Sequence, residues 1–162
     1  MVTQPLAMEA GPAQGSTVLA RDFRAELNNY YAALLTISPS QADAPWREHG
    51  WTRKQILGHL LDSAANNRQR FVRAAIDGQY SGPNYAQDAW LAAHGYEYES
   101  WETLLRWWRT EHEILAAVVD RIPDDRLDAK CRVGDGPVIT LRSLVEDYLA
   151  HHRQHFQQLI AL

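Results

Sequence analysis

The sequence lacks the features that mark several large classes of protein. It contains one cysteine, Cys131, among 162 residues, so no disulfide can form within the chain, as is usual in a reducing compartment. It has no run of about 20 apolar residues, the length that crosses a bilayer as a helix. Its N-terminus has neither the cationic start nor the apolar stretch of a secretory signal. We therefore expect a cytoplasmic protein without a membrane partner.

Concentrated positive charge is also missing. The chain has 16 Lys+Arg against 20 Asp+Glu, a formal net charge of -4, and no block of basic residues. Because nucleic-acid binding normally requires a basic face, we expect no nucleic-acid partner. Hydrophobic residues make up 46% of the chain and charged residues 22%, which is the composition of one folded domain with one core.

Apolar residues recur at spacings of three and four along most of the chain, the pattern of amphipathic helices. Residues 1–17 are the exception. They are rich in Gly, Pro, Ala and Gln without periodicity, which predicts a flexible N-terminal tail before a helical-bundle domain at residues 18–162. Ser38-Pro39 is expected to end the first helix, because the residue before a proline disfavours the helical region. The pattern predicts four long helices, within residues 18–37, 52–77, 100–122 and 140–162.

Capping residues mark several of these boundaries. Thr52 and Gln55 have the spacing of a capping box, Gly78 is a typical helix stop, and Ser100 and Thr140 are suitable N-caps. A hairpin is expected around residues 132–133 and 138–139.

The longest connection joins the second and third long helices. Residues 79–99 carry many aromatic side chains, so we expect this segment to pack on the bundle, with a short helix near residues 88–94. Its length allows it to cross from one end of a bundle to the other. The predicted fold class is therefore all-α, a four-helix bundle with a long crossover connection between helices two and three.

The last helix carries histidines where its apolar stripe should continue. That stripe contains Leu141, Leu144, Val145, Tyr148 and Leu159. His152 and His155 lie on it and His151 lies at its edge, and a buried imidazole costs free energy unless it is hydrogen-bonded or ligates a metal. His151 and His155 are four residues apart, so their rings can converge on one ion. His152 and His155 can converge as well, and periodicity alone favours His152 over His151.

A third ligand candidate, His59, lies on the second long helix at the margin of its core face. Polar residues continue along the same side, namely Asp62, Ser63, Asn66 and Arg70. A ligand cavity between helices requires such a polar seam beside an apolar face. A single histidine on a helix is nevertheless more often structural than a ligand, and structural histidines without a metal remain an alternative. His49, His94 and His112 have no partner at ligand spacing, and we interpret them as incidental.

Three segments resemble the DinB-like (DinB/YfiT) superfamily, in particular its YfiT-like branch. The segment WTRKQILGHLLDSA (residues 51–64), continued by NNRQRFV (66–72), resembles the second helix of that family. The segment DYLAHHRQH (147–155) resembles its terminal helix. The segment YAQDAW (85–90) is similar to a loop motif of the branch, with Ala86 where an acid is expected. The resemblance covers roughly residues 20–162.

The resemblance implies a four-helix bundle with an uncommon crossover topology. It also implies a divalent metal held by one histidine of the second helix and two of the last. Carried over to this sequence, the ligands are His59, His151 and His155, which overrides the preference for His152. The remaining candidates for supporting the ligands or contacting substrate are Asp62, Asn66, Arg70 and His152.

Family members with known activity are metal-dependent thiol transferases and isomerases that use low-molecular-weight thiols such as bacillithiol or mycothiol, and others are regarded as metal-dependent hydrolases. The resemblance therefore implies a thiol S-transferase or hydrolase that acts on a small molecule, with such a thiol as cosubstrate. The alternative is a non-catalytic metal- or ligand-binding helical module. A homodimer is compatible with so small a bundle.

An open three-histidine site suits one zinc or nickel ion and leaves positions free for water or substrate. Asp62, one turn from His59, is predicted to orient that ring. Because an unperturbed histidine titrates near pH 6.5, metal binding is expected to weaken below about pH 6.

Overall fold

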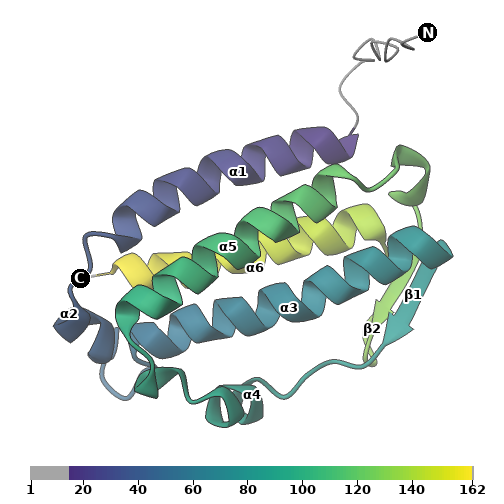
Figure 1. Cartoon of the computed structure of the whole chain (residues 1–162). Coiled ribbons are helices and arrows are strands. Elements are labelled where there is room, and N and C mark those ends of the chain that lie inside the picture. Colours follow the sequence, from purple (N-terminus) through teal and green to yellow (C-terminus); the bar gives the residue numbers. More distant parts are fainter. Residues whose placement is uncertain (1–14, 162) are drawn as a thin grey trace, which may run out of the picture.

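The computed structural model describes residues 15–161, which fold mainly into helices (Figure 1). Four long helices form a bundle, and they are α1 (Gly15–Leu34), α3 (Arg53–Asp77), α5 (Trp101–Asp120) and α6 (Leu141–Ile160). Helices α1 and α3 each pack against both α5 and α6. The predicted four-helix bundle is confirmed. In the part of the chain that the structure describes, no helix combines the length and apolar character needed to cross a membrane.

The connection between α3 and α5 crosses the whole length of the bundle. Helices α3 and α5 run in the same direction in Figure 1, and the chain returns between them along the outside of α3. The connection contains α4 (Gln87–His94) and the 3-10 turn η1 (Tyr96–Tyr98). The predicted long crossover and its short helix are therefore confirmed. The connection packs on the bundle through Tyr96, which is buried, whereas Tyr98 is exposed.

The helix ends agree with the capping signals of the sequence. The Thr52 hydroxyl accepts a hydrogen bond from the backbone N–H of Gln55, whose side chain accepts one from the N–H of Thr52. Gly78 closes α3 with φ 73, a left-handed conformation that glycine adopts without steric cost. Ser100 and Thr140 cap α5 and α6 through their hydroxyl oxygens. The caps at Thr52, Gly78 and Thr140 fix the boundaries of the two helices that carry the candidate site.

Two expectations about the N-terminal region are corrected. Helix α1 begins at Gly15, so residues 15–17 are helical rather than part of a tail, while residues 1–14 of the predicted tail lie outside the described residues. Ser38 and Pro39 do not end α1, which stops at Leu34, but begin a further helix, α2 (Pro39–Asp43). The physical reason is that Ser38 is an N-cap, and proline is tolerated in the first helical turn because its missing N–H would have no partner there.

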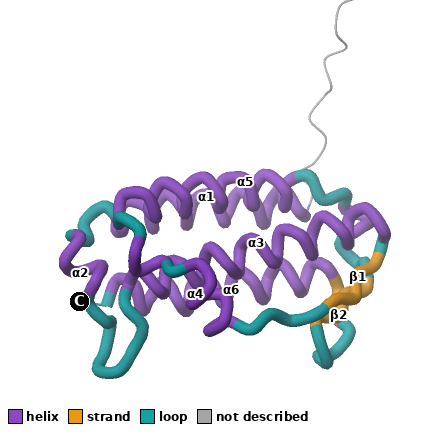
Figure 2. Tube along the Cα trace, turned by 60° about the horizontal axis from the view of Figure 1, so that its bottom comes forward, coloured by secondary structure: helices purple, strands orange, loops and turns teal. Residues whose placement is uncertain are grey.

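A small sheet lies at one end of the bundle (Figure 2). Strand β2 (Lys130–Val133) pairs antiparallel with β3 (Ile139–Thr140), which confirms a hairpin close to the predicted position. Strand β1 (Gln79–Gly82) adds a parallel pairing with β2 that the sequence did not predict. The pairing attaches the start of the crossover to the segment that precedes α6. After α5 the chain reaches β2 through the 3-10 turn η2 (Asp124–Arg126).

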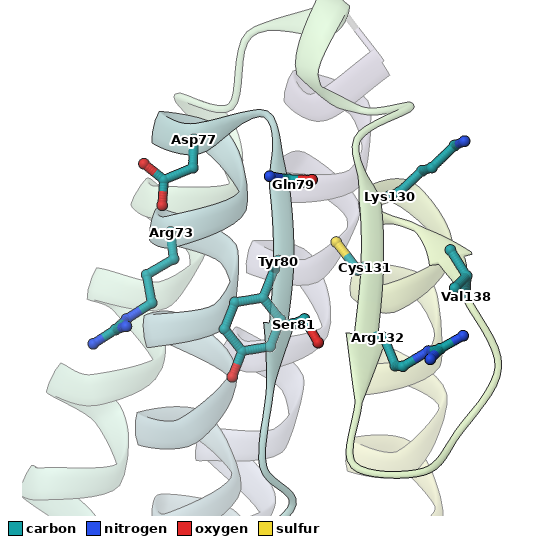
Figure 3. Close-up of a pocket in the computed structure, with 9 residues that line it drawn as sticks. All are labelled: Arg73, Asp77, Gln79, Tyr80, Ser81, Lys130, Cys131, Arg132 and Val138. Carbon is teal, nitrogen blue, oxygen red and sulfur yellow. The ribbon is translucent and has the colours of Figure 1, made fainter.

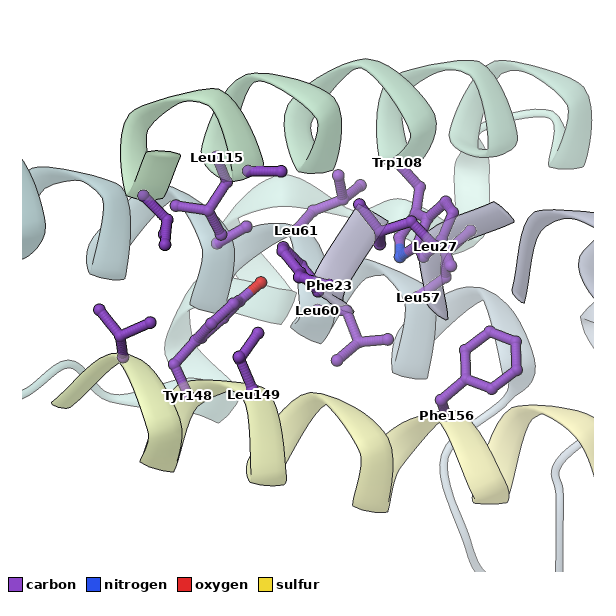
Figure 4. Close-up of a cluster of buried hydrophobic side chains, with 14 of the residues drawn as sticks. Phe23, Leu27, Leu57, Leu60, Leu61, Trp108, Leu115, Tyr148, Leu149 and Phe156 are labelled. Carbon is purple, nitrogen blue, oxygen red and sulfur yellow. The ribbon is translucent and has the colours of Figure 1, made fainter. Parts of the chain in front are cut away.

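The hydrophobic core lies between the four long helices (Figure 4). Its largest fully buried side chains include Trp108, Phe23, Phe71, Phe156 and Leu27. Two histidines, His112 and His152, are also fully buried in this region.

Gly58 lies where the ring of Tyr96 packs against α3. A Cβ at this position would lie 2.1 Å from Cδ2 of Tyr96. In a free helix, exchanging glycine for alanine stabilises by about 1 kcal/mol. Here the base of a buried ring would have to move, so we expect Gly58→Ala to lower the free energy of unfolding by about 1–3 kcal/mol in urea denaturation. In a Tyr96→Ala background the same exchange should be neutral or stabilising, and an equal loss there would contradict this explanation.

Candidate metal centre

Three histidines from two antiparallel helices meet in one cluster. His59 comes from α3, whereas His151 and His155 come from α6. Their candidate ligand atoms all lie within 4.8 Å of one another. Nε2 of His59 lies 3.2 Å from Nε2 of His151. Two imidazoles bound tetrahedrally to one ion at ordinary zinc distances would have nitrogens about 3.3 Å apart. The donor set and its spacing therefore fit a divalent ion, while metal binding itself stays a prediction.

The helices account for this convergence. His151 and His155 are one turn apart on α6, so they share a face. That face is turned toward α3, where His59 is flanked by the buried Ile56 and Leu60. His59 is almost fully buried and the other two are half-buried. The cluster therefore has one wall in the core and one side near solvent.

Burial keeps two of these rings unprotonated at neutral pH. Burial, followed by the nearby His155 and His151, lowers the pKa of His59 to about 3. Burial, followed by His155, lowers the pKa of His151 to about 4. Both rings therefore offer lone pairs at pH 7. Protons compete with a metal at these two positions only well below the pH 6 expected for unperturbed histidines.

His155 is oriented by a neighbour on its own helix. Its Nδ1 lies 2.9 Å from Oε1 of Gln158. Because the amide oxygen accepts, this contact places the proton on Nδ1 and leaves the Nε2 lone pair available. Gln158 was not among the predicted supporting residues, although its i+3 spacing from His155 is the available signal.

Asp62 does not orient His59, so that prediction is wrong. Its Oδ1 accepts hydrogen bonds from the hydroxyl of Tyr96 at 2.6 Å and from Nδ1 of His94 at 2.9 Å, whereas Nδ1 of His59 has no partner in the described structure. The physical reason is that the crossover brings two donors against this face of α3, and the short carboxylate bonds to them. Burial raises the pKa of Asp62, against the hydrogen bonds from Tyr96 and His94. His94 is therefore not incidental.

His152 lies in the core and not in the cluster. Its ring stacks on Tyr30 and contacts those of Trp108 and His112, with centroids 5.6, 5.9 and 4.8 Å away. Neither of its ring nitrogens has a hydrogen-bond partner among the described residues. Periodicity placed this residue correctly on the buried stripe of α6, and for that reason it points away from the other two histidines. The interpretation of His112 as incidental overlooked that it is buried beside His152.

A cavity of about 340 Å³ adjoins the histidine cluster. It lies between α3 and α6 and has His151 in its wall. Among its polar lining residues are Ser63, Asn67, Arg70 and Tyr85. Of the polar side chains predicted to line a cavity along α3, Ser63 and Arg70 therefore border this one. Asn66 lines a neighbouring cavity of about 490 Å³, and Asp62 lines neither.

Comparison with known proteins places this chain in a family. The sequence model of the DinB superfamily matches residues 22–159, which is most of the chain. The chain belongs to the DinB superfamily. The match includes all three histidines of the cluster, the whole of α3 and all but the last residue of α6.

Curated relatives of this DinB-superfamily chain align over shorter segments. YfiT of Bacillus subtilis (strain 168), which carries the name of an inferred metal-dependent hydrolase, is 34% identical over 58 residues, 36% of this chain and 33% of the relative. A protein of Bacillus mycoides (strain KBAB4) with the same description is 30% identical over 63 residues, 39% of this chain and 36% of the relative. The matched segments thus span about a third of each relative's length.

Two solved structures share the DinB-superfamily fold. YfiT from Bacillus subtilis, described as having an unusual four-helix bundle topology, superimposes with a TM-score of 0.74 at 21% identity, over 98% of this chain and 89% of that chain. The mycothiol-dependent maleylpyruvate isomerase superimposes with a TM-score of 0.62 at 18% identity, over 94% and 61%. At these identities the likeness establishes the crossover bundle and leaves the activity open.

A cavity beside the small sheet of this DinB-superfamily chain contains the single cysteine (Figure 3). This cavity of about 590 Å³ shares no lining residue with the histidine cluster. Cys131 is fully buried, burial raises the pKa of its thiol, and the thiol donates to the carbonyl of Ala129. A protonated, buried thiol is unreactive, so any sulfur nucleophile at the cluster would come from another molecule.

Proposed function

We propose that this chain is a metal-dependent thiol S-transferase that joins a low-molecular-weight thiol to a small electrophile. The observation that carries the proposal is the three-histidine cluster, one member of which, His151, lines the 340 Å³ cavity. Three neutral imidazoles hold zinc or nickel and leave coordination positions open, as catalytic sites do. Support also comes from the shared fold of a protein whose name states that it depends on mycothiol.

The residues of the chain have separate parts in this proposal. His59, His151 and His155 would hold the ion, and Gln158 would keep the His155 ring in the binding orientation. The ion, when bound, would lower the pKa of a coordinated thiol so that the sulfur is a thiolate. The cavity between α3 and α6 would receive the electrophile beside His151.

The test is a screen of metal-loaded protein with several thiols, including bacillithiol, mycothiol, glutathione and cysteine, against an aryl chloride. In each turnover an S–C bond forms, the C–Cl bond breaks, chloride leaves with the electron pair, and the thiol proton passes to buffer. We expect at least one thiol to react roughly tenfold or more above the uncatalysed rate, within the range of activated nucleophiles. The excess rate should disappear with a chelator. No acceleration with any thiol would contradict the proposal.

Hydrolysis is the second candidate function, and the inferred metal-dependent hydrolases among the relatives favour it. A metal held by three histidines also activates water. An activated ester offered without any thiol separates the two functions. Chelator-sensitive ester cleavage together with no thiol transfer would support the hydrolase. Metal binding without either activity would support a non-catalytic binding module.

The contact between Gln158 and His155 gives a graded prediction. Gln158→Leu removes the acceptor at 2.9 Å from Nδ1 of His155. Loss of such an orienting partner typically weakens metal affinity about 10–100-fold, and we expect this range in a competition titration with a chromogenic chelator. Gln157→Leu is the matched control, because Gln157 is exposed on the same turn. Equal affinities of the two variants would show that the contact does not support the ligand.

A further inference from the structure

Arg70 is a buried cation without a counter-ion. Its side chain on α3 is 7% exposed. Its two hydrogen bonds go to Oδ1 of Asn67 at 3.5 Å and to the carbonyl of Pro83 at 3.4 Å, both at the limit of hydrogen-bond length. Among the described residues, no carboxylate lies within ion-pair distance of it. Burying a charge is costly unless it is paired and hydrogen-bonded, so this guanidinium is poorly compensated.

The other buried cations of the chain are compensated. Lys54 forms an ion pair with Asp43 at 2.8 Å. Arg53 donates to carbonyl oxygens of Leu159, Gln41 and Ala161. Arg70 is therefore an exception within the described residues, and the missing partner is an anion.

Arg70 lines two neighbouring cavities, of about 340 and 490 Å³, and the place for that anion is the first, because only that one also has a histidine of the cluster in its wall. Arg70 and His151 line the same cavity of about 340 Å³, together with the polar side chains of Ser63, Asn67 and Tyr85. Arg70 follows His59 by eleven residues, about 17 Å along the helix axis. Helical side chains lean toward the N-terminus, which for Arg70 is the direction of His59.

One acid also lines this cavity, and it does not neutralise Arg70. Asp147 is exposed and forms no ion pair with the guanidinium. Its charge is solvated at the rim, whereas that of Arg70 is buried in the wall. An anion of suitable size therefore gains more from the buried cation than it loses to the exposed acid.

We infer that Arg70 binds a carboxylate of the molecule that occupies this cavity, so that the site takes a small carboxylate-bearing substrate. A guanidinium binds a carboxylate through two parallel hydrogen bonds. The inference takes one element from the proposed function, namely that the reacting atom of the substrate lies at the three histidines. The carboxylate belongs either to the electrophile or to the thiol, and both sources share the same chemistry.

The first test measures binding without any reaction. The full chain, both metal-loaded and treated with a chelator, is titrated calorimetrically with meta-nitrobenzoate and with meta-nitrobenzamide, which differ only in the carboxylate. We expect the benzoate to bind wild-type protein at least tenfold more tightly than the amide, and Arg70→Gln to abolish this preference. If Arg70 binds the carboxylate, the preference for the benzoate should persist in the metal-free protein. If only the metal ion bound the carboxylate, the preference would disappear with the metal.

Two further variants keep this test decisive. Arg73→Gln removes the same charge three residues further along α3 from an exposed side chain outside this cavity, and it should retain the preference. Arg70→Lys retains the charge without the paired donors, and it should retain part of the preference even if Arg70→Gln folds poorly. No preference in wild-type protein, or an equal loss in Arg73→Gln, overturns the inference.

The kinetic arms identify the source of the carboxylate. One pairs a chloronitrobenzoate with N-acetylcysteine amide, and the other pairs the corresponding chloronitrobenzamide with N-acetylcysteine. Arg70→Gln should raise KM about tenfold only for the partner that carries the recognised carboxylate. If neither pair reacts with any variant, the proposed transferase function fails, while the binding titration still decides whether Arg70 recognises carboxylates.

Discussion

Replacing His59 with alanine is expected to reduce the bound divalent metal from about one ion per chain to near zero. His59 is the only one of the three clustered histidines on α3, so its loss leaves two donors on a single helix. Loss of a partner that merely orients a ligand already weakens metal affinity about 10–100-fold, and loss of a direct ligand should exceed that range. Elemental analysis of protein made without a polyhistidine tag measures the effect.

The matched control for this variant is His49→Asn. His49 is a histidine with an exposed side chain and a φ of 57, a conformation that asparagine tolerates. Its exchange should leave the metal content unchanged. The double variant His151→Ala, His155→Ala should lose metal as His59→Ala does. Full metal content in either cluster variant would refute the assignment of the ligands.

Acidification from pH 7 to about pH 4 is expected to remove a large part of the stability of the metal-free protein. His112 and His152 are fully buried. Burial lowers the pKa of His112 to about 4, against the hydrogen bond to the carbonyl of Trp108. Burial, followed by the nearby His112, lowers the pKa of His152 as well. Both rings therefore remain neutral in the folded protein at a pH where they would be charged in the unfolded chain.

The direction of the effect is set by proton counting. Below about pH 6.5 the unfolded chain binds protons at these residues and the folded chain does not, so stability falls as the pH falls. Each such histidine contributes up to about 1.36 kcal/mol per pH unit. For His112 the window runs from 6.5 to about 4, which gives on the order of 3 kcal/mol. That is a substantial fraction of the roughly 5–15 kcal/mol that stabilises most domains.

Urea denaturation at several pH values between 7 and 4.5 tests this expectation. Carboxylates also titrate in this range, so the informative quantity is the difference in slope between wild-type protein and a variant. His112→Leu should reduce the slope of the free energy of unfolding against pH by the contribution of about one proton. The exchange of the exposed His49 in His49→Asn should reduce this slope far less. Identical slopes for wild-type protein and His112→Leu would show that the buried ring is already charged in the folded state.

The parts of the fold that were predictable are those set by local sequence. Thr52 with Gln55, Gly78, Ser100 and Thr140 fix helix ends within a few residues of themselves, and the structure confirms each of these caps. The region after α1 was ambiguous, because a Ser-Pro pair such as Ser38-Pro39 can either end one helix or begin another.

The parts that were not predictable depend on contacts between distant segments. The pairing of β1 with β2 joins residues about fifty positions apart and leaves no periodic signal in either segment. Contacts between distant segments were equally unpredictable at the candidate metal site. The spacing of His151 and His155 and the family resemblance indicated the cluster, whereas the contact of Asp62 with His94 depends on where the crossover packs. The missing counter-ion of Arg70 became visible only in three dimensions.

The parallel pairing of β1 with β2 has a consequence for the order of folding. Strand β1 directly follows α3, and β2 and β3 precede α6, so the strands come together when these two helices dock. Because a sheet of such short strands is marginally stable by itself, we expect it to form after the helices have docked. The cavity beside His151 depends on Val133 and Ile139 from the sheet region, whereas the three histidines depend only on α3 and α6. We therefore expect the nascent protein to become able to capture metal before it can bind substrate. Pulsed hydrogen exchange during refolding should accordingly protect α3 and α6 before β1 and β2.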